Sequence, residues 1–463
     1  MRQLWIVLCI GLVFPLSLYA QESGRVHVGG YGAIRFETGN LERAYDTFTF
    51  RRLILTTDVA ITSRIRFMTE IEYERFRALE LEKSVEPSSG LSVEQAVEGT
   101  SESEIAIEQA WLEYTVRDFL RFRAGGLLVP VGRFNIRHDD NLWALPRRSL
   151  VDRGAPVLPS KAAWNELGMG LAGMVPLGAR GLVSYELYVM NGVALDVEVE
   201  QEVKSSDGPG YALNEVKVSF QPGTGTFGLD TKNAKALSGR FVFSPLPGQE
   251  LALSGYLGRY TPEFLRPEYM RSVGVDGLLS WRNIALEGEY VYTHSGDLRA
   301  VAADFARQAV TQVGEFVEGE QGELLKSEVR YDLAGLAGVK QGYWLEARYE
   351  FFPAFLEQTF LGEDEDPHFT LAARMEQVWF TDLLTTAAFS EGELVRFETN
   401  DRFVNRFTLG LTYRPTALVG FQIAYERTWT DKGKSLADVT NYLVAEGYED
   451  TYDAILLGVV FGF

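Results

Sequence analysis

The end of the chain constrains its fold most. From Tyr452 to Phe463, large apolar side chains stand at every second position: Ile455, Leu457, Val459, Phe461 and Phe463. A period of two places neighbouring side chains on opposite faces of a β-strand. A soluble protein gains little from ending on its most apolar strand, because chain ends fray in water. A membrane barrel needs such a strand, since its last strand must pair with its first. This segment alone also fits a buried strand of a soluble sandwich.

The other end of the chain favours the membrane. Arg2 precedes an apolar run from Leu4 to Leu18, and Tyr19-Ala20 is followed by polar residues. This pattern predicts a secretory signal over residues 1–20, too short to span a bilayer as a helix, with cleavage after Ala20. Cys9, the one cysteine, lies inside it, so we expect a mature chain, residues 21–463, without thiols or disulfides.

Composition narrows the class further. After the signal there is no run of about 18 apolar residues, so we expect no transmembrane helix. Aromatic residues make up 13% of the chain, and it contains 45 glycines. The formal net charge of −20 argues against a nucleic-acid partner, which would require a basic face. An exported chain of many short alternating segments indicates a transmembrane β-barrel.

The alternating segments carry full charges on one face. Ile65, Phe67, Ile71 and Tyr73 alternate with Arg64, Arg66, Glu70, Glu72 and Glu74. Charged side chains fit a water-filled lumen, where they are not transferred into hydrocarbon. The same test predicts about sixteen strands, near the length that a tilted membrane strand needs. They span 25–37, 47–60, 63–77, 104–117, 120–131, 165–176, 180–191, 235–246, 249–261, 271–282, 284–294, 342–353, 369–381, 402–414, 418–430 and 451–463.

The connections between these segments alternate in length. Short turns follow the second, fourth, sixth, eighth, tenth and fourteenth segments, and long polar stretches follow most odd-numbered ones. Short periplasmic turns and long extracellular loops produce this pattern. The acidic connection 354–368 is too long for an ordinary turn. We interpret 78–103, 192–234 and 295–341 as solvated loops, with a short amphipathic helix from Ala300 to Glu318.

The third long connection, 132–164, is basic within an acidic chain. Its charged residues include Arg133, Arg137, His138, Arg147, Arg148, Arg153 and Lys161, against Asp139, Asp140 and Asp152. Arg121 and Arg123 precede it on the predicted lumen face. A ring of like charges at a constriction selects ions by sign, so these arginines are candidate pore residues. They could equally pair with nearby aspartates or cross-strand glutamates and hold the loop down. The sequence leaves both interpretations open.

Several stretches bear a family resemblance. They are Arg121-Phe-Arg-Ala-Gly-Gly-Leu-Leu-Val-Pro-Val-Gly-Arg-Phe, Pro146-Arg-Arg-Ser-Leu-Val-Asp, Tyr185-Glu-Leu-Tyr-Val-Met-Asn-Gly, Gly342-Tyr-Trp-Leu-Glu-Ala-Arg-Tyr, Thr408-Leu-Gly-Leu-Thr-Tyr-Arg-Pro and Phe421-Gln-Ile-Ala-Tyr-Glu-Arg. In this order, the chain resembles the phosphate-selective porin O and porin P family of outer-membrane channels. The resemblance implies a trimeric barrel of sixteen antiparallel strands with an inward-folded third extracellular loop. It also implies the outer membrane of a Gram-negative-type bacterium, with lipid and lipopolysaccharide around the barrel.

The predicted lumen departs from the phosphate-specific members, which line their pore with arginine and lysine. Here Arg64, Arg66, Arg121, Arg123, Arg240, Arg282, Arg348, Arg374 and Arg406 face Glu70, Glu72, Glu74, Glu113, Glu287, Glu289, Glu346, Glu350 and Glu376. Among the counter-charges we single out Glu70, Glu72, Glu113, Asp139 and Asp140. A mixed lumen passes small polar solutes of either sign with modest preference.

We therefore predict an outer-membrane porin for passive diffusion of small hydrophilic solutes. A more specific form of this prediction is a preference for anions such as phosphate. Two alternatives stay open. One is an adhesion or anchoring barrel, whose lumen apolar residues would plug. The other is a barrel hydrolase using Ser149 and His138, although no spacing enforces a catalytic triad. We expect no catalytic residue, cofactor or metal site.

Overall fold

The computed structural model describes residues 25–40, 46–75, 78–86, 92–100, 103–154, 157–159, 163–205, 212–223, 230, 232–305, 307, 329–330, 336–390, 393–436 and 450–463. The predicted signal, residues 1–20, lies outside these ranges. Sixteen antiparallel strands form one closed barrel, as predicted. They are β1 (Val26–Gly39), β2 (Thr47–Ala60), β3 (Ile65–Arg75), β6 (Ser103–Arg117), β7 (Leu120–Leu128), β8 (Asn165–Leu177), β9 (Gly181–Met190), β12 (Ala236–Ser244), β13 (Gln249–Arg259), β14 (Tyr269–Trp281), β15 (Ile284–Ser295), β17 (Ala337–Phe351), β18 (His368–Ser390), β19 (Glu393–Thr416), β20 (Val419–Trp429) and β21 (Thr451–Gly462).

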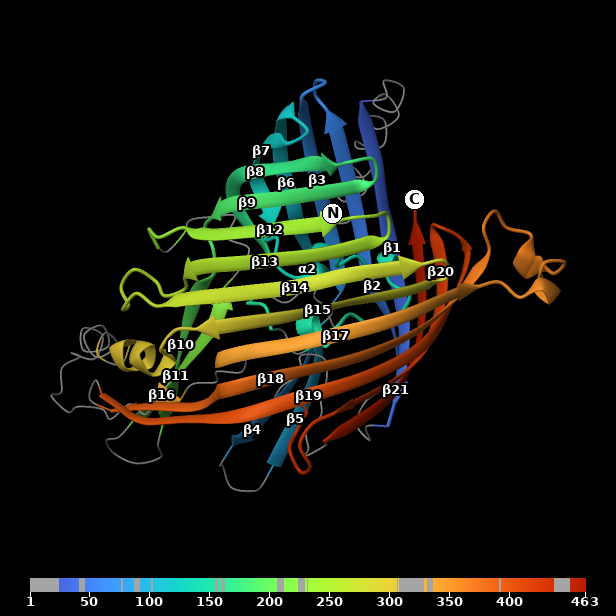
Figure 1. Ribbon diagram of the computed structural model, residues 1–463. Coiled ribbons are helices and arrows are strands. Elements are labelled where there is room, and N and C mark those ends of the chain that lie inside the picture. The colour runs from blue at the N-terminus through green and yellow to red at the C-terminus, as the bar shows by residue number, and fades with distance from the viewer. Residues whose placement is uncertain are drawn as a thin grey trace, which may run out of the picture.

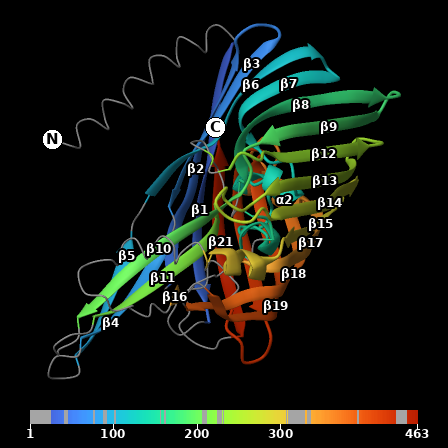
Figure 2. The same ribbon diagram turned by 90° about the vertical axis from the view of Figure 1, so that its left-hand side faces the viewer.

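The last strand closes the ring. β21 pairs with β20 on one side and with β1 on the other, and β1 and β21 lie side by side in Figures 1 and 2. The amide of Gly30 donates to the carbonyl of Phe463 at 3.2 Å, and the amide of Phe463 donates back to Gly30 at 3.1 Å. Closure leaves no strand edge that lipid would have to satisfy.

The two faces of the wall differ in polarity as the alternation predicted. Ile455 and Leu457 are exposed on the outside, whereas Leu456 between them is buried. Inner-face side chains on other strands include the buried Glu70 and Arg240. The outside is therefore apolar and the inside carries the charges, which is the polarity of a membrane barrel.

The three long connections interpreted from sequence as loops contain strands. β4 (Ala78–Glu86) and β5 (Ser92–Thr100) form a hairpin, and β10 (Ala194–Ser205), β11 (Ala212–Gly223) and β16 (Val329–Arg330) form a small sheet. The loop interpretation was wrong because dense glutamate was taken as a sign of irregular structure. Valine and glutamate alternate from Val197 to Glu200, and that alternation is a strand pattern.

Several strand boundaries also differ from the prediction. β18 and β19 continue to Ser390 and from Glu393, so a long hairpin with bulges replaces the expected loop after residue 381. Arg64 and Arg282 lie in exposed turns and not on the lumen face, and Arg282 has φ 55°. The strand prediction extended two segments into these turns because their charges continued the alternation.

The acidic connection between β17 and β18 is folded, with short helices η3 (Ala354–Leu356) and η4 (Phe360–Gly362). It projects from one end of the barrel, and β10, β11 and β16 lie at the other end (Figure 1). Residues 298–305 are helical, and the rest of the predicted helix to Glu318 falls almost wholly outside the described residues. None of the helices in the described part of the chain has the length and hydropathy of a membrane-spanning helix.

Candidate functional site: the inner loop and the lumen charges

The chain between β7 and β8 turns into the barrel. We call residues 129–164 the inner loop. Gly132 has φ 78°, a conformation that favours glycine, and it redirects the chain after Pro130. The amide of Val129 donates to the carbonyl of Trp164 at 2.8 Å, which closes the base of the loop. The Asn135 side chain joins the same two ends: its Nδ2 donates to Val129 and its Oδ1 accepts from the Trp164 amide, both at 2.8 Å.

An aromatic cluster packs the inner loop against the wall. The ring of Phe134, in helix α2 (Arg133–Ile136), stacks on Trp143 with centroids 4.1 Å apart, and Trp344 of β17 meets both rings edge-on. The guanidinium of Arg374 lies 5.2 Å from the centre of Phe134. Phe134 is fully buried, so the loop is docked by packing as well as by charge.

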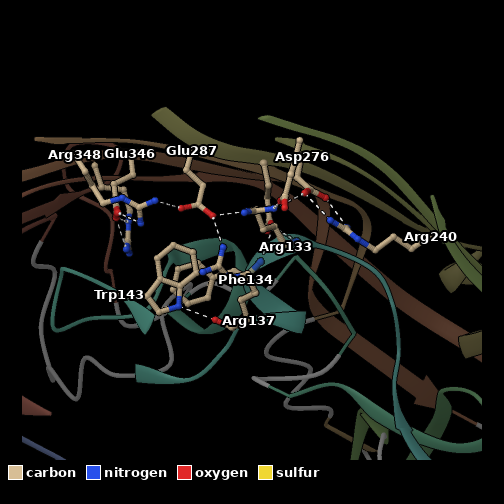
Figure 3. Close-up of polar contacts among 12 residues, drawn as sticks. Arg133, Phe134, Arg137, Trp143, Arg240, Asp276, Glu287, Glu346 and Arg348 are labelled. Atoms are coloured by element: carbon tan, nitrogen blue, oxygen red, sulfur yellow. Dashed lines mark hydrogen bonds and ion pairs between the residues drawn. The ribbon is translucent and has the colours of Figure 1, made fainter. Parts of the chain in front are cut away.

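A line of alternating charges fixes helix α2 (Figure 3). Arg133 pairs with Glu287 of β15, with Glu250 of β13 at 2.7 Å and with Asp276 of β14 at 3.6 Å. Asp276 also accepts from Arg240 at 2.6 and 2.7 Å. On the other side Glu287 pairs with Arg348 at 2.5 Å. The next links continue along the wall: Arg348 to Glu346 at 3.3 Å and Glu346 to Arg374 at 2.6 Å.

A second line fixes the later part of the inner loop. Arg147 pairs with Glu37 of β1 and with Glu426 of β20, the latter at 2.9 Å. Arg406 of β19 joins Glu426 at 3.6 Å and Glu376 of β18 at 2.5 Å. The two lines meet at the loop backbone, because Arg374 donates to the carbonyl of Arg147 at 3.0 Å. We call the two lines together the ion ladder. It contains the arginines 133, 147, 240, 348, 374 and 406 and the carboxylates of Glu37, Glu250, Asp276, Glu287, Glu346, Glu376 and Glu426.

These contacts describe the surroundings of most candidate arginines. Arg133 and Arg147 belong to the ion ladder, and Arg148 pairs with Asp152 at 2.9 Å. All three are almost fully buried. Their charges are neutralised by wall or loop carboxylates, so the geometry favours the interpretation that they hold the loop down. The side chain of Arg153 lies outside the described residues.

Three candidates keep part of their surface open. The side chain of Arg137 is 37% exposed and lies 3.3 Å from Glu287, and its guanidinium is 5.9 Å from the centre of the Trp143 ring (Figure 3). Arg123 pairs with Glu113 at 2.6 Å and Glu186 at 2.7 Å, and Arg121 approaches Glu113 at 3.8 Å. Among the described candidates, these three guanidiniums keep exposed surface.

A second charged cluster lies on the wall of β2, β3 and β6. We call it the acidic corner: Arg52, Glu70, Glu72, Glu108, His138 and Asp139. Arg52 pairs with Glu72 and, at 2.9 Å, with Glu108. Glu108 also lies 2.9 Å from His138 Nε2, while Glu70 accepts from Gln109 at 2.6 Å. Burial lowers the pKa of His138, but the adjacent Glu108 and Asp139 carboxylates outweigh it and raise the pKa to about 9.

The counter-charges predicted from sequence fall in these clusters. Glu70 and Glu72 belong to the acidic corner, and Glu113 faces Arg123. Asp140 is buried in the inner loop, and its amide donates to the hydroxyl of Tyr31 at 3.2 Å. The sequence analysis missed Arg52 and Glu108. Arg52 could have been found from its period-two relation to the inward Ile54, but the adjacent Arg51 obscured which arginine points inward.

The Ser149–His138 pair of the hydrolase alternative is not formed. Ser149 is fully buried and its hydroxyl accepts from the amide of Asp152 at 3.2 Å. The two ring nitrogens of His138 contact the carbonyl of Asn135 and the carboxylate of Glu108, each at 2.9 Å. A base already engaged in this way is not positioned to activate Ser149.

Sequence comparison gives little information on relatives of this chain. A search of known protein families finds no match for this chain. A protein of Aquifex aeolicus (strain VF5), described as uncharacterized, is 27% identical over 250 residues, which is 50% of this chain and 50% of that protein. The chain thus spans about half the length of the curated relative that it matches.

Solved structures with a similar fold are barrels. An anion-selective porin from Comamonas acidovorans has a TM-score of 0.49 at 9% identity, covering 95% of this chain and 99% of that one. The channel DcaP of Acinetobacter baumannii has 0.45 at 10%, and OmpF of Salmonella typhi with daunomycin has 0.47 at 11%, each covering 95% of this chain and 97% of the other. At these scores and identities we draw no functional conclusion from them, and the resemblance to porins O and P stays a prediction.

Proposed function

We propose that this protein is a porin of a bacterial outer membrane, through which small hydrophilic solutes diffuse passively. One observation carries the proposal: sixteen antiparallel strands close into a ring with apolar side chains outside and charged side chains inside. Barrels of this size leave an aqueous lumen that side chains of the wall alone do not fill. An apolar exterior suits lipid, and a charged interior suits water and polar solutes.

The inner loop narrows this lumen in the proposal. Its arginines are matched by carboxylates, so the strong anion selectivity of an unpaired arginine ring is not expected. A modest anion preference, with phosphate among the anions, would depend on Arg121, Arg123 and Arg137, which retain exposed surface.

The surroundings of the barrel belong to the same proposal. Export by the segment 1–20, a lipid and lipopolysaccharide environment, and assembly as a homotrimer are the expected accompaniments of such a channel. Chemical cross-linking of the protein in outer-membrane vesicles tests the last of these. Trimer-sized products support it, and monomer alone at saturating cross-linker contradicts it.

Planar-bilayer recording tests the function itself. The full-length protein should produce discrete conductance steps in potassium chloride, and the reversal potential in a salt gradient should indicate a modest preference for chloride over potassium. Repeating the measurement in potassium phosphate gives the preference between the two anions. A matched preparation of heat-unfolded protein is the control for contaminating channels. Bilayers that stay silent at high protein concentration would contradict the proposal.

One observation favours the anchoring alternative. The inner loop brings buried apolar residues into the lumen, among them Val157 and Leu158 and the aromatic pair Phe134 and Trp143. An anchor would have its lumen plugged by such residues. The same bilayer experiment separates the two, because a plugged barrel folds and inserts but conducts no ions.

A further inference from the structure

The acidic corner has the geometry of a cation site. One ligand atom each from Glu70, His138 and Asp139 can be chosen such that all three lie within 4.8 Å of one another. We propose that these three side chains bind a divalent transition-metal ion, with Zn²⁺ as the representative ion, and so join the inner loop to β3. Glu70 comes from the wall, whereas His138 and Asp139 come from the loop. The proposal does not depend on whether the barrel conducts.

The orientation of His138 prepares one ring nitrogen for a metal. Nδ1 lies 2.9 Å from the backbone carbonyl of Asn135, which can only accept a hydrogen bond, so Nδ1 carries a proton. Metal-binding histidines typically donate their second nitrogen to a carbonyl or carboxylate in this way. Nε2 faces the corner, bonded to Glu108 at 2.9 Å and 3.8 Å from Asp139, so a metal ion on Nε2 has to replace the bond to Glu108.

One carboxylate oxygen of Asp139 has no hydrogen-bond donor within the described part of the chain. This oxygen, Oδ1, is also shielded from solvent. The 3.8 Å to His138 Nε2 is too long for a hydrogen bond. A shielded carboxylate oxygen without a donor is costly unless a cation satisfies it.

The charge balance of the corner points the same way. Four carboxylates, those of Glu70, Glu72, Glu108 and Asp139, stand with two cationic side chains, Arg52 and His138. Glu72 and Glu108 already share Arg52, and Glu70 is bonded only by the neutral Gln109 amide among the contacts resolved here. A divalent ion that replaces the His138 proton would reduce this negative excess from two charges to one.

The ligand set selects the kind of metal. One imidazole nitrogen and two carboxylate oxygens suit Zn²⁺ better than Ca²⁺ or Mg²⁺, which prefer oxygen ligands alone. Zinc ligands stand about 2.0–2.2 Å from the ion, so the three atoms must approach one another. Asp139 can move because its side chain is 32% exposed. On binding, the Nε2 proton is released to solvent, and Glu108 keeps its pair with Arg52 at 2.9 Å.

Metal analysis of the full-length protein in detergent tests the proposal. After removal of metal with EDTA, the protein is equilibrated with zinc, passed through a desalting column and analysed for bound zinc per chain. We expect one zinc ion per chain for the unmodified protein. Asp139→Asn should weaken binding by at least about tenfold, because losing a ligand costs no less than losing a group that supports one. His138→Gln should do the same.

Matched variants separate a site from nonspecific binding. Asp58→Asn removes a carboxylate that pairs with Arg66 near the β2–β3 turn, and His294→Gln removes a histidine on β15. Both should bind zinc as the unmodified protein does. Asp139→Asn keeps the test decisive if His138→Gln fails to fold, since Asp139 lies partly at the surface. Absence of retained zinc, or equal binding by Asp139→Asn and Asp58→Asn, would overturn the proposal.

Discussion

The ion ladder and the acidic corner, on two sides of the lumen, differ in their balance of opposite charges. In the ion ladder six arginines meet seven carboxylates, and each charge has an opposite neighbour. In the acidic corner carboxylates outnumber cations by four to two. Both clusters contact the inner loop, the ladder through Arg133 and Arg147 and the corner through His138 and Asp139.

The difference shows what each side can do. A matched buried network contributes little net stability, but removing one member leaves an uncompensated charge and costs several kcal/mol. Such a network holds the loop in one position. An unmatched cluster gains when a cation arrives, so it is suited to binding. Substitutions of the same kind on the two sides should therefore have opposite signs.

Glu287→Gln should produce the largest effect. Glu287 contacts Arg133, Arg137 and Arg348, and the amide keeps its shape but not its charge. We expect a loss of about 3–5 kcal/mol in the unfolding free energy, as for other broken buried ion pairs. Urea titration of the protein folded into lipid vesicles measures it.

The matched control for this change is Glu398→Gln. Glu398 pairs with Arg396 at 2.7 Å, and both side chains are about half exposed or more. Its loss should cost below about 1 kcal/mol, because water screens exposed pairs. Equal effects of the two substitutions would show that the ladder is no more than a set of solvated pairs.

Phe134→Leu should come next. The substitution removes the stacked contact with Trp143 and the edge contact with Trp344 and leaves a gap in a fully buried position. We expect a loss of about 1–3 kcal/mol, measured by the same urea titration. Phe355→Leu is the control, because Phe355 is 79% exposed and its change should stay within about 0.5 kcal/mol. If Phe355→Leu lowered the unfolding free energy more than Phe134→Leu does, the packing of Phe134 in the inner loop would not be a major source of stability.

Much of the wall could be predicted from sequence because period two is a local signal. β2 spans Thr47–Ala60, the predicted range, and β21 differs from its prediction by one residue. The apolar outside and charged inside force the register of each strand, since a slip of one residue would expose charges to lipid. Prediction failed at β10 and β11, because their glutamates were taken as a sign of a solvated loop although they continue a period-two alternation.

The inner loop could be located but not interpreted from sequence. Arg133 lies 117 residues from Glu250 and 154 from Glu287 along the chain, so no spacing indicates these pairs. The acidic corner was missed for the same reason: Glu70 and His138 meet only after the loop folds inward, and a search for metal motifs in sequence tests nearby residues. A basic segment in an acidic chain was a correct sign of an electrostatic task, but whether a charge is paired is decided by tertiary structure.

Glu70→Gln tests the other side of the comparison. It removes one of four carboxylates, and glutamine can still accept from Gln109. In EDTA-containing buffer we expect no loss of stability and a gain of up to about 1 kcal/mol from relieved repulsion. In saturating zinc the unmodified protein should be more stable than the variant, because it gains stability from binding and the variant gains less. A loss in EDTA as large as that of Glu287→Gln would abolish the distinction between the two sides.

Arg137→Gln should have the smallest effect on stability, because Arg137 is the most exposed of the described loop arginines that we singled out. We expect a change below about 1 kcal/mol, since its pair with Glu287 is partly solvated and Glu287 keeps Arg133 and Arg348. Its effect should instead be seen in ion preference. The reversal potential in a salt gradient should shift toward the equilibrium potential of the cation, because an exposed positive group is lost.

Arg396→Gln is the matched change for this last experiment, because it removes an arginine of the β18–β19 hairpin that is 61% exposed. It should leave ion preference unaltered. If Arg137→Gln gives the same reversal potential as Arg396→Gln and as the unmodified protein, then Arg137 belongs with Arg133 and Arg147 as a residue that only holds the loop. A shift confined to Arg137→Gln would instead divide the inner loop by function: its buried arginines fix the position of the loop, and its exposed arginine acts on the solute.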